Sequence, residues 1–484
     1  MKLKHKLAAL ILCLLATAPV ADRAFAEQKE DFKAAIDFSL RERCVSHDKT
    51  AVRITDVATG ETLYDLNGSS PLLPASVMKL VTTATALNYL GVNYKFKTDV
   101  LYSGKRERGV IKGDLIIRGG GDPKLTPEVV WLIADEVRRQ GIREVTGNLV
   151  LDTSFFDDHT IPPARHGRRT QRPYDAPIGA LSVNFNTIAV HVYPGEAVGA
   201  PVIAEVEPRS DYFRVINDAV TRSRVKRPVS ALRVNGDGKV NIKITGAMRP
   251  DDAPGIIYIN IDDPTMFAGE TFRAFLKNAG VNVAGGIVKG VTPTTARLIH
   301  AHQSEPISVI LRELNRFSNN FIAEQVIKTV GAETMGAPGT HEKGLSMVEK
   351  FLNESGIDTT GAVFADGSGL SKENRVSAKM LTDLLLLMSK RFDIGPDFVA
   401  SPGIMGVDGS VRKRLKTSPA KSQARAKTGT LNGVSSLSGY VSGRDGKLFA
   451  FAILQNNNAC YYKGAHNIQD KIVTAIHLLA EKKR

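Results

Sequence analysis

Three short motifs, far apart and in a fixed order, constrain the fold of this chain more than any other feature. They are Ser76-x-x-Lys79, Ser318-x-Asn320 and Lys427-Thr428-Gly429. Ser318 follows Ser76 by 242 residues, whereas Lys427 follows Ser318 by 109. If the three motifs serve one site, the domain that holds them is split in the sequence. An insertion of roughly 200 residues, long enough for more than one module, then lies between its halves.

The first motif gains its weight from its surroundings. Ser-x-x-Lys occurs five times, starting at Ser46, Ser76, Ser223, Ser410 and Ser418. What selects Ser76 is a helix start: Pro74 suits a first turn, and apolar residues then recur over 77–90 with helical spacing. We therefore expect Ser76 in the first turn of a buried helix, with Lys79 one turn further along the same face. This arrangement gives a hydroxyl nucleophile an amine as its base.

In this order the motifs are the signature of serine penicillin-binding proteins and β-lactamases. The longer stretches 74–80, 318–324, 365–371 and 426–431, with 119–123 and 151–155 in the insertion, resemble one family closely. It is that of the D-alanyl-D-alanine carboxypeptidase/endopeptidases, the class C low-molecular-mass penicillin-binding proteins. The resemblance spans nearly all of the mature chain. Lys372 departs from it, since relatives often carry Arg there, and we interpret Asp366, Gly367 and Gly369 as a tight turn.

The resemblance implies the fold class. It is an α/β (α+β) fold, in which a serine transpeptidase/β-lactamase-like domain has an antiparallel sheet flanked by helices and is interrupted by two inserted β-rich domains. We expect a signal peptide at 1–26 and a split catalytic domain at 27–97 and 298–484. Inserted domain II is expected at 98–170 and 256–297, and inserted domain III at 171–255. Short strand patterns separated by turns rich in Gly, Asp and Pro also indicate that the insertion is β-rich.

Cleavage of a peptide after D-Ala gives each motif residue a role. Ser76 attacks and forms an acyl-enzyme, and Lys79 is its base. Ser318 relays a proton to the leaving amine, while Asn320 holds the substrate amide and Lys79. A lysine with an ordinary pKa near 10.4 is neutral in only about one molecule in 2,500 at pH 7. A helix N-terminus and a second ammonium, that of Lys427, lower that pKa, so two lysines at one site make chemical sense.

Substrate-binding residues are expected around the third motif. Lys427 directs positive charge toward the substrate carboxylate, and the candidates beside it are Thr428, Gly429, Thr430 and Asn432. By resemblance, the backbone N–H groups of Ser76 and Thr430 form the oxyanion hole. Taken singly, these residues have plainer interpretations, since Asn320 alone suits a helix surface and Lys427 alone suits a strand edge.

Two residues of the insertion are further candidates. Asp152 and Phe155 are expected to read the diaminopimelate side chain of wall peptides, because they resemble the family's contact from the insertion to the cleft. The carboxylate would pair with the substrate ammonium and the ring would pack along its aliphatic stem. The alternative is that Asp152 caps a turn through its own backbone. No metal site is expected, because His300-x-His302 has no accompanying ligand spacing.

The first 26 residues predict export to the periplasm. A basic start is followed by an apolar run over 7–20 and by the cleavage site Ala24-Phe25-Ala26. The apolar run is too short to span a bilayer, so no stable membrane anchor is expected. The mature chain keeps two cysteines, Cys44 and Cys460. We predict a disulfide between them, since they flank strands that are neighbours in the family's fold and the compartment is oxidising.

The partners follow from charge and from the resemblance. The formal net charge is +14 at pH 7, with basic patches at 165–172, 222–227 and 412–414. Export and the lack of a nucleic-acid motif argue against nucleic acid. An anionic envelope polymer and an ordinary solvated surface remain as interpretations of the patches. The resemblance implies peptidoglycan stem peptides as substrate, β-lactam antibiotics as covalent inhibitors, and no cofactor.

Two other functions stay open at this point. A β-lactamase shares the three motifs but needs a deacylating water, and no Glu-x-x-Leu-Asn segment is present to position one. A non-catalytic wall-binding protein on the same fold would not need the full set of Ser76, Lys79, Ser318, Asn320 and Lys427. We therefore favour a serine D,D-peptidase.

Overall fold

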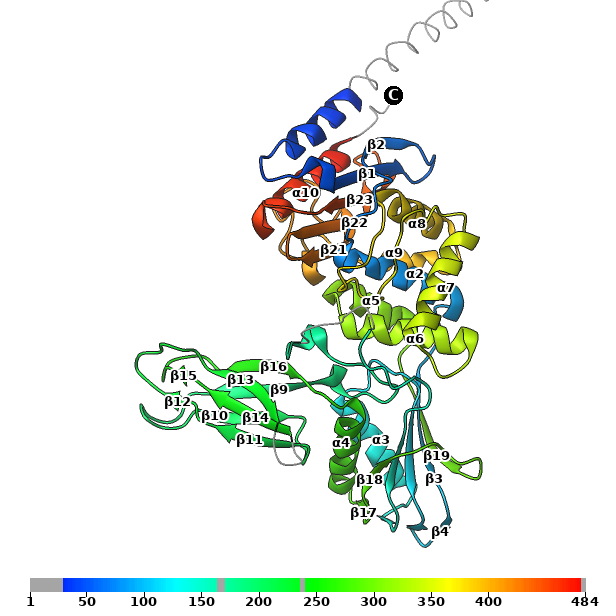
Figure 1. Cartoon of the computed structure of the whole chain (residues 1–484), viewed down its shortest axis with the longest axis vertical. Coiled ribbons are helices and arrows are strands. Elements are labelled where there is room, and N and C mark those ends of the chain that lie inside the picture. The colour runs from blue at the N-terminus through cyan, green and yellow to red at the C-terminus, as the bar shows by residue number, and fades with distance from the viewer. Residues whose placement is uncertain (1–28, 163–169, 236–239, 480–484) are drawn as a thin grey trace, which may run out of the picture.

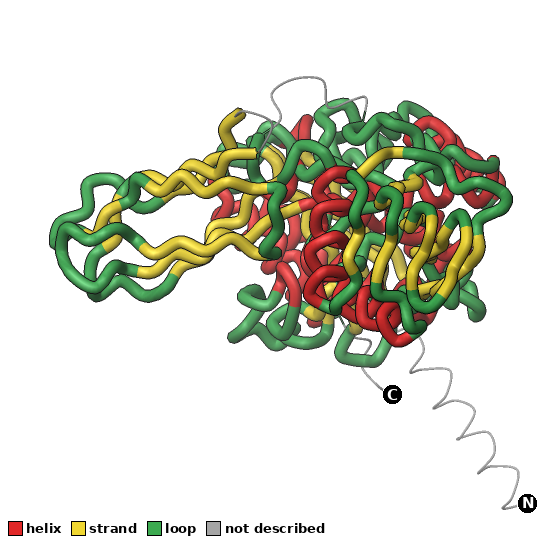
Figure 2. The backbone as a smooth tube through the Cα atoms, turned by 90° about the horizontal axis from the view of Figure 1, so that it is seen from below, coloured by secondary structure: helices red, strands yellow, loops and turns green. Residues whose placement is uncertain are grey.

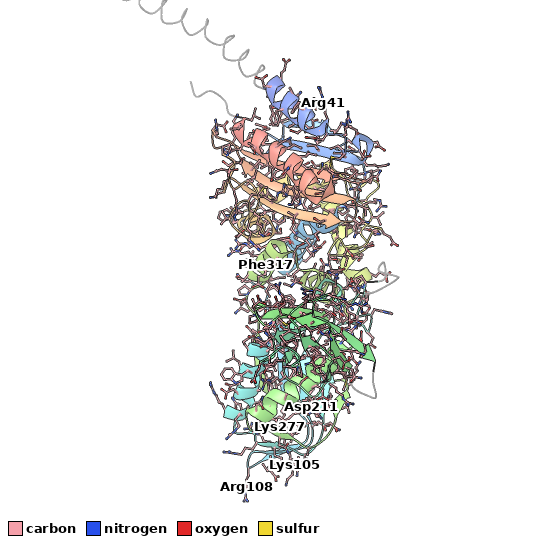
Figure 3. All side chains as sticks on the ribbon, turned by 90° about the vertical axis from the view of Figure 1, so that its left-hand side faces the viewer. Arg41, Lys105, Arg108, Asp211, Lys277 and Phe317 are labelled. Carbon is pink, nitrogen blue, oxygen red and sulfur yellow. A yellow bond between two sulfur atoms is a disulfide. The ribbon has the colours of Figure 1, made fainter. Side chains whose placement is uncertain are left out.

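The structure is a computed structural model that describes residues 29–162, 170–235 and 240–479. The predicted signal peptide at 1–26 lies outside the described residues, as does most of the basic patch at 165–172. The molecule is long, with a helix-rich upper part and a strand-rich lower part (Figure 1). Arg41 lies near the upper end, Arg108 at the lower end, and Phe317 at an intermediate level (Figure 3).

A six-stranded antiparallel sheet forms the framework of the upper part. Its order is β2 (Thr62–Leu66), β1 (Thr50–Asp56), β23 (Leu448–Gln455), β22 (Val434–Ser442), β21 (Ala424–Leu431) and β20 (Gly403–Ile404). The pairing of β1 with β23 joins the two ends of the chain, with Ile54 opposite Phe451. The antiparallel sheet flanked by helices that the resemblance implies is therefore present, and the predicted fold class is confirmed.

Helices cover both faces of this sheet, because successive side chains of a strand point to opposite faces. On one face, Phe449, Phe451 and Ile453 of β23 pack with a helix over 29–40 and with α10 (Tyr461–Leu478). On the other face, Ala450, Ala452 and Leu454 join the apolar core of the remaining helices. These are α2 (Met78–Leu90), α5 (Ile307–Phe317), α6 (Asn320–Met335), α7 (His341–Glu354), α8 (Ala378–Lys390) and α9 (Gly395–Ala400).

A disulfide closes the upper end of the molecule. It joins Cys44, which precedes β1, to Cys460, the residue before α10, and this confirms the predicted pairing. The C-terminal helix packs on the sheet through its apolar residues Ile468, Ile472 and Ile476. Within the described part of the chain, no helix is both long enough and apolar enough to cross a bilayer.

The lower part is built from strands of the insertion and two helices. A five-stranded sheet has the order β18 (Ile287–Lys289), β8 (Leu149–Asp152), β6 (Leu115–Gly119), β3 (Lys97–Tyr102) and β19 (Arg297–Gln303). It packs against α3 (Pro127–Arg139) and α4 (Pro264–Asn278). A four-stranded sheet continues below it, with the order β17 (Asn282–Val283), β7 (Glu144–Val145), β5 (Val110–Lys112) and β4 (Lys105–Glu107).

Small sheets project to one side of the lower part (Figures 1 and 2). One has the order β10 (Ile203–Glu207), β9 (Thr187–Tyr193) and β16 (Gly255–Asn260), and a second β11 (Phe213–Asn217), β14 (Val240–Thr245) and β13 (Ser230–Asn235). A third pairs β12 (Val220–Thr221) with β15 (Ala247–Met248).

One stretch of the insertion reaches the upper part. Residues 173–185 include the short 3₁₀ helix η4 (Pro173–Asp175), which contacts α6. Ala176, Ile178 and Phe185 from this stretch pack with the apolar core of α2 and α6. The ring of Phe185 meets that of Phe321 on α6 edge to face, with centroids 6.0 Å apart. The insertion is thus anchored beside the start of α6, where the second motif lies.

Candidate active site

Ser76 lies in a 3₁₀ turn, η2 (Ala75–Val77), and α2 begins only at Met78. The sequence predicts a regular first helical turn here, and the structure differs because Ala75 takes a positive φ of 48°. Such a conformation is strained for a residue with a side chain and is held only by packing around it. Gly369 and Gly429 supply that packing. A Cβ atom added at Gly369 would lie 1.9 Å from the carbonyl oxygen of Ala75. One added at Gly429 would lie 2.6 Å from the carbonyl oxygen of Pro74.

Lys79 is fully buried and points at the nucleophile. Its Nζ donates to Ser76 Oγ at 2.9 Å, to Asn320 Oδ1 at 2.7 Å and to the Ser368 carbonyl at 2.6 Å. An ammonium group has three N–H donors, so these three acceptors fix its direction. When the amine is neutral, the first of these hydrogen bonds reverses and Nζ accepts the Ser76 proton. The first two motifs therefore meet as a nucleophile with its base.

Ser318 and Lys427 form a second serine–lysine pair. Ser318 ends α5 in the left-handed conformation, with a φ of 58°. Lys427 is fully buried on β21, and its Nζ donates to Ser318 Oγ at 2.9 Å and to the Thr428 carbonyl at 2.7 Å. Burial lowers the pKa of Lys427 well below its ordinary value, and the nearby charge of Lys79 lowers it further.

Strand β21 carries the third motif past the nucleophile. The ideal Cβ position at Gly429 is 3.1 Å from the Ser76 backbone nitrogen, so the strand and the 3₁₀ turn lie in direct contact. Thr428 shares a hydrogen bond with Ser410 between their hydroxyl oxygens, 2.8 Å apart. Thr430 is exposed on the same strand, and Asn432 is exposed in the turn that follows. The structure thus brings the three motifs together.

The structure does not bring Asp152 to this cluster. Asp152 ends β8 and is 1 % exposed. Its Oδ1 accepts from the Ser154 N–H at 3.0 Å, and its Oδ2 accepts from the N–H and the hydroxyl of Thr292. Burial alone would raise the pKa of Asp152, but the hydrogen bonds from Ser154 and Thr292 outweigh it and hold the pKa below its ordinary value. The carboxylate is committed to the insertion itself, which corrects the expectation that it faces substrate.

Phe155 also has partners within the chain. Its ring stacks on Phe156 with centroids 5.2 Å apart, and its carbonyl accepts from the Gly339 N–H at 2.8 Å. Phe156 in turn lies under the ammonium of Lys328 on α6. This segment therefore joins the insertion to the later turns of α6, whereas Asn320 begins that helix.

Sequence reasoning missed several atoms of the site. The carbonyl of Ser368 holds Lys79, and the carbonyl of Tyr174 accepts from Asn320 Nδ2 at 3.1 Å. Backbone acceptors leave no signal in a sequence. The stretch around Asp366 is the tight turn that the sequence indicates, since its carboxylate accepts from the Gly369 and Ser371 N–H groups. Its contribution to the site through Ser368 was not expected.

A separate groove lies away from these motifs. It has a volume of about 1320 Å³ and runs between the helix over 29–40, α10 and the loop that follows Gly409. The groove includes the predicted basic patch 412–414 and also Ser410, whose hydroxyl shares a hydrogen bond with Thr428. Among the described residues, no group of three or more His, Cys, Asp or Glu side chains is placed to hold a metal ion.

One serine is hydrogen-bonded to a buried lysine, and a second serine is hydrogen-bonded to a buried lysine on a strand of the antiparallel sheet. This arrangement defines a class of serine acyl-transfer enzymes. Comparison with known proteins places the chain within that class. The chain belongs to the D-Ala-D-Ala carboxypeptidase 3 (S13) family, whose model matches residues 32–478.

Known relatives agree with this assignment. A D-alanyl-D-alanine carboxypeptidase of Actinomadura sp. (strain R39) is 35% identical over 470 residues, which cover 93% of this chain and 85% of the relative. The crystal structure of penicillin binding protein 4 (dacB) from Haemophilus influenzae is similar, with a TM-score of 0.78 and 24% identity over 91% of this chain and 97% of that one. The same protein complexed with a β-lactam has a TM-score of 0.74 and 25% identity, with the same coverage. The resemblance predicted from the motifs is confirmed, and the chain is a serine-type D-Ala-D-Ala carboxypeptidase.

Proposed function

We propose that Ser76 is the nucleophile of this carboxypeptidase and that it removes the terminal D-Ala from peptidoglycan stem peptides. The observation that carries the assignment is the 2.9 Å hydrogen bond between Lys79 Nζ and Ser76 Oγ, with Asn320 and the Ser368 carbonyl holding the amine in place. Endopeptidase cleavage of D-Ala–diaminopimelate cross-links uses the same acyl-enzyme, because only the leaving amine differs.

The reaction follows from the two serine–lysine pairs. Neutral Lys79 takes the proton of Ser76 as Oγ bonds to the carbonyl carbon of the penultimate D-Ala. The N–H groups of Ser76 and Thr430 stabilise the oxyanion, a contribution of about 3 kcal/mol for each donor. The C–N bond then breaks, and the leaving amine of D-Ala receives a proton through Ser318. Water hydrolyses the ester, with Lys79 again as base.

The carboxylate of the substrate is bound at β21. Lys427 is buried on this strand, Thr428 follows it and shares a hydrogen bond with Ser410, and Thr430 is exposed. Gly429 keeps the strand against the 3₁₀ turn of Ser76. Asn432, exposed in the next turn, completes this side. A positive charge with neighbouring hydroxyl donors is the pattern that a terminal carboxylate requires.

We propose that β-lactam antibiotics acylate Ser76, because they present a strained amide and a carboxylate to the same groups. The relative solved with a β-lactam supports this. The test is Ser76→Ala with a fluorescent penicillin, and the matched control is Ser223→Ala, an exposed serine of another Ser-x-x-Lys sequence. We expect Ser76→Ala to lose labelling and D-Ala release while it stays folded. A covalent adduct on folded Ser76→Ala protein contradicts the assignment.

We further propose that residues 1–26 export the chain to the periplasm and that the mature part divides into three domains. The pairing of β1 with β23 supports a catalytic domain formed from 27–97 and 298–484. The pairing of β18 with β8 supports a domain II made of two segments, 98–170 and 256–297. Because β19 (Arg297–Gln303) pairs with β3, the second segment extends beyond 297, to Gln303. Because β16 pairs with β9, domain III extends slightly beyond 171–255, to Asn260.

A further inference from the structure

A buried carboxylate on α6 holds the turn behind Lys79. Glu324 is 2 % exposed, and its two oxygens accept from successive peptide N–H groups, those of Gly367 at 3.2 Å and Ser368 at 3.0 Å. The carbonyl of the same Ser368 accepts from Lys79 Nζ at 2.6 Å. Glu324 is thus linked to the catalytic amine through a single residue of the turn.

The turn has little freedom around this link. Thr82 on α2 donates to the Gly367 carbonyl at 2.6 Å, so the turn is gripped from α2 as well as from α6. A Cβ at Gly367 would lie 2.3 Å from Ile327 Cγ1, which shows how closely the turn rests on α6. Movement of Glu324 would therefore be passed to the Ser368 carbonyl rather than absorbed between the helix and the turn.

Titratable side chains from α2, α6, α7 and the turn lie around Glu324. His341, 2 % exposed at the start of α7, places Nε2 3.5 Å from Glu324 Oε2. Lys328 lies one turn further along α6, Asp366 lies in the turn itself, and Lys79 is on the far side of Ser368. The site holds two buried ammonium groups, those of Lys79 and Lys427, so a buried carboxylate near them offsets part of their mutual repulsion.

We propose that Glu324 is a positioning residue for Lys79. It fixes the Ser368 carbonyl that orients the amine toward Ser76, and its charge sets how readily that amine carries a proton. This inference rests on the proposed role of Lys79 as the base.

The test is Glu324→Gln, which keeps the size of the side chain and removes its charge. The measured quantity is the second-order rate constant for acylation by benzylpenicillin, per folded molecule, across pH. We expect a fall of about 10- to 100-fold, the range for hydrogen bonds that lose a charged acceptor. We also expect the acid limb of the profile to move to lower pH, since removal of a negative charge disfavours the protonated form of Lys79. The matched control is Glu333→Gln, on the exposed end of the same helix, where the Glu333 carboxylate accepts from the Tyr94 hydroxyl at 2.8 Å.

Glu324→Asp keeps the charge and shortens the reach, and it decides the question if the Gln variant does not fold. We expect a lower acylation rate with the acid limb where the wild-type enzyme has it. A wild-type rate and pH profile in either folded variant overturns the inference, and so does a loss of thermal stability with an unchanged rate per folded molecule. These outcomes stand apart from failure of the proposed function, which Ser76→Ala tests. If Ser76→Ala is inactive while Glu324→Gln matches the wild type, only the role of Glu324 is wrong.

Discussion

Lys427 donates a hydrogen bond to Ser318 Oγ at 2.9 Å from a fully buried position on β21. The pair repeats the relation between Lys79 and Ser76 across the same site. Each lysine is deprived of water and has the other as a charged neighbour, so each disfavours protonation of the other. The buried amine of Lys427 therefore has a lowered pKa and gives up its proton more readily than an exposed lysine does.

We expect that burial of the Lys427 amine lowers the free energy of unfolding, although the enzyme needs this group for activity. Lys427→Met keeps the length of the side chain and removes the charge. Release of D-Ala should fall by about 10²- to 10³-fold, as for other losses of a preorganised charge. The melting temperature should stay equal or rise, because an apolar side chain suits the buried position. Lys416→Met, at an exposed lysine, is the control, and a clear fall in the melting temperature of Lys427→Met would contradict this account.

The sign of the pH dependence for Lys427 follows from its lowered pKa. Between the folded and unfolded pKa values, the unfolded chain binds more protons at this position than the folded chain. The contribution of Lys427 to the free energy of unfolding therefore rises with pH in that window. The difference in stability between Lys427→Met and the wild type should shrink as pH is raised toward 10, and denaturant unfolding at several pH values measures it.

The buried carboxyl group of Asp122, in the lower part of the molecule, makes the free energy of unfolding depend on pH. Burial raises its pKa from 3.8 to about 6, against the lowering effect of Lys124. Between those two values the folded state binds more protons than the unfolded state, so stability falls as pH rises. Asp122→Asn should raise the free energy of unfolding by about 1–3 kcal/mol above pH 6 and change it little below pH 4. Urea unfolding at both pH values checks this, with exposed Asp211→Asn as control. An equal change at the two pH values would count against the burial of a charged Asp122.

Asp152 is expected to act on stability and not on substrate choice. Its lowered pKa means that its contribution is present above the unfolded value and is lost as pH falls through the folded one. Asp152→Asn should lower the free energy of unfolding at pH 7 by about 1.5–3 kcal/mol, since its partners Ser154 and Thr292 lose a charged acceptor. The kcat/KM for diaminopimelate peptides and the acylation rate with penicillin should change by the same factor. A loss confined to diaminopimelate peptides would restore the substrate-reading role.

The disulfide should stabilise the folded protein without affecting the reaction at Ser76. Replacing Cys44 and Cys460 by Ser opens a link between residues 416 positions apart. The free energy of unfolding should fall by about 2–5 kcal/mol, with acylation at 25 °C unchanged. A reducing agent should lower the stability of the wild type to that of the variant and leave the variant unaffected. If reduction has no effect on the wild type, the bond does not stabilise the fold.

The parts of the site that sequence could predict are those whose chemistry needs a particular side chain. The order of the motifs predicted five site residues, Ser76, Lys79, Ser318, Asn320 and Lys427. In the structure Lys79 is hydrogen-bonded to Ser76 and Asn320, and Lys427 is hydrogen-bonded to Ser318. The antiparallel sheet and the disulfide were both implied by the resemblance to the family, the disulfide through the order of the strands that its cysteines flank.

The rest depended on three-dimensional packing. Ala75 takes its left-handed conformation because Gly369 and Gly429 press against the chain before Ser76. The carbonyls of Ser368 and Tyr174 belong to residues whose side chains gave no reason to select them. The expectation that Asp152 faces substrate came from the resemblance, which could not show that its carboxylate accepts hydrogen bonds from Ser154 and Thr292.

The pairing of β1 with β23 also affects the order in which the parts of the protein fold. A chain made from its N-terminus presents Ser76 early, whereas the strand that supports it on the other side, β21, is among the last segments to appear. The long connection must close before these elements meet, and such non-local pairings form late. The inserted sheets, whose strands all precede residue 304, can fold while the sheet of the upper part is still incomplete. A partly made copy that lacks β21 therefore lacks Lys427 and holds no complete site, so activity begins only after this strand has been made.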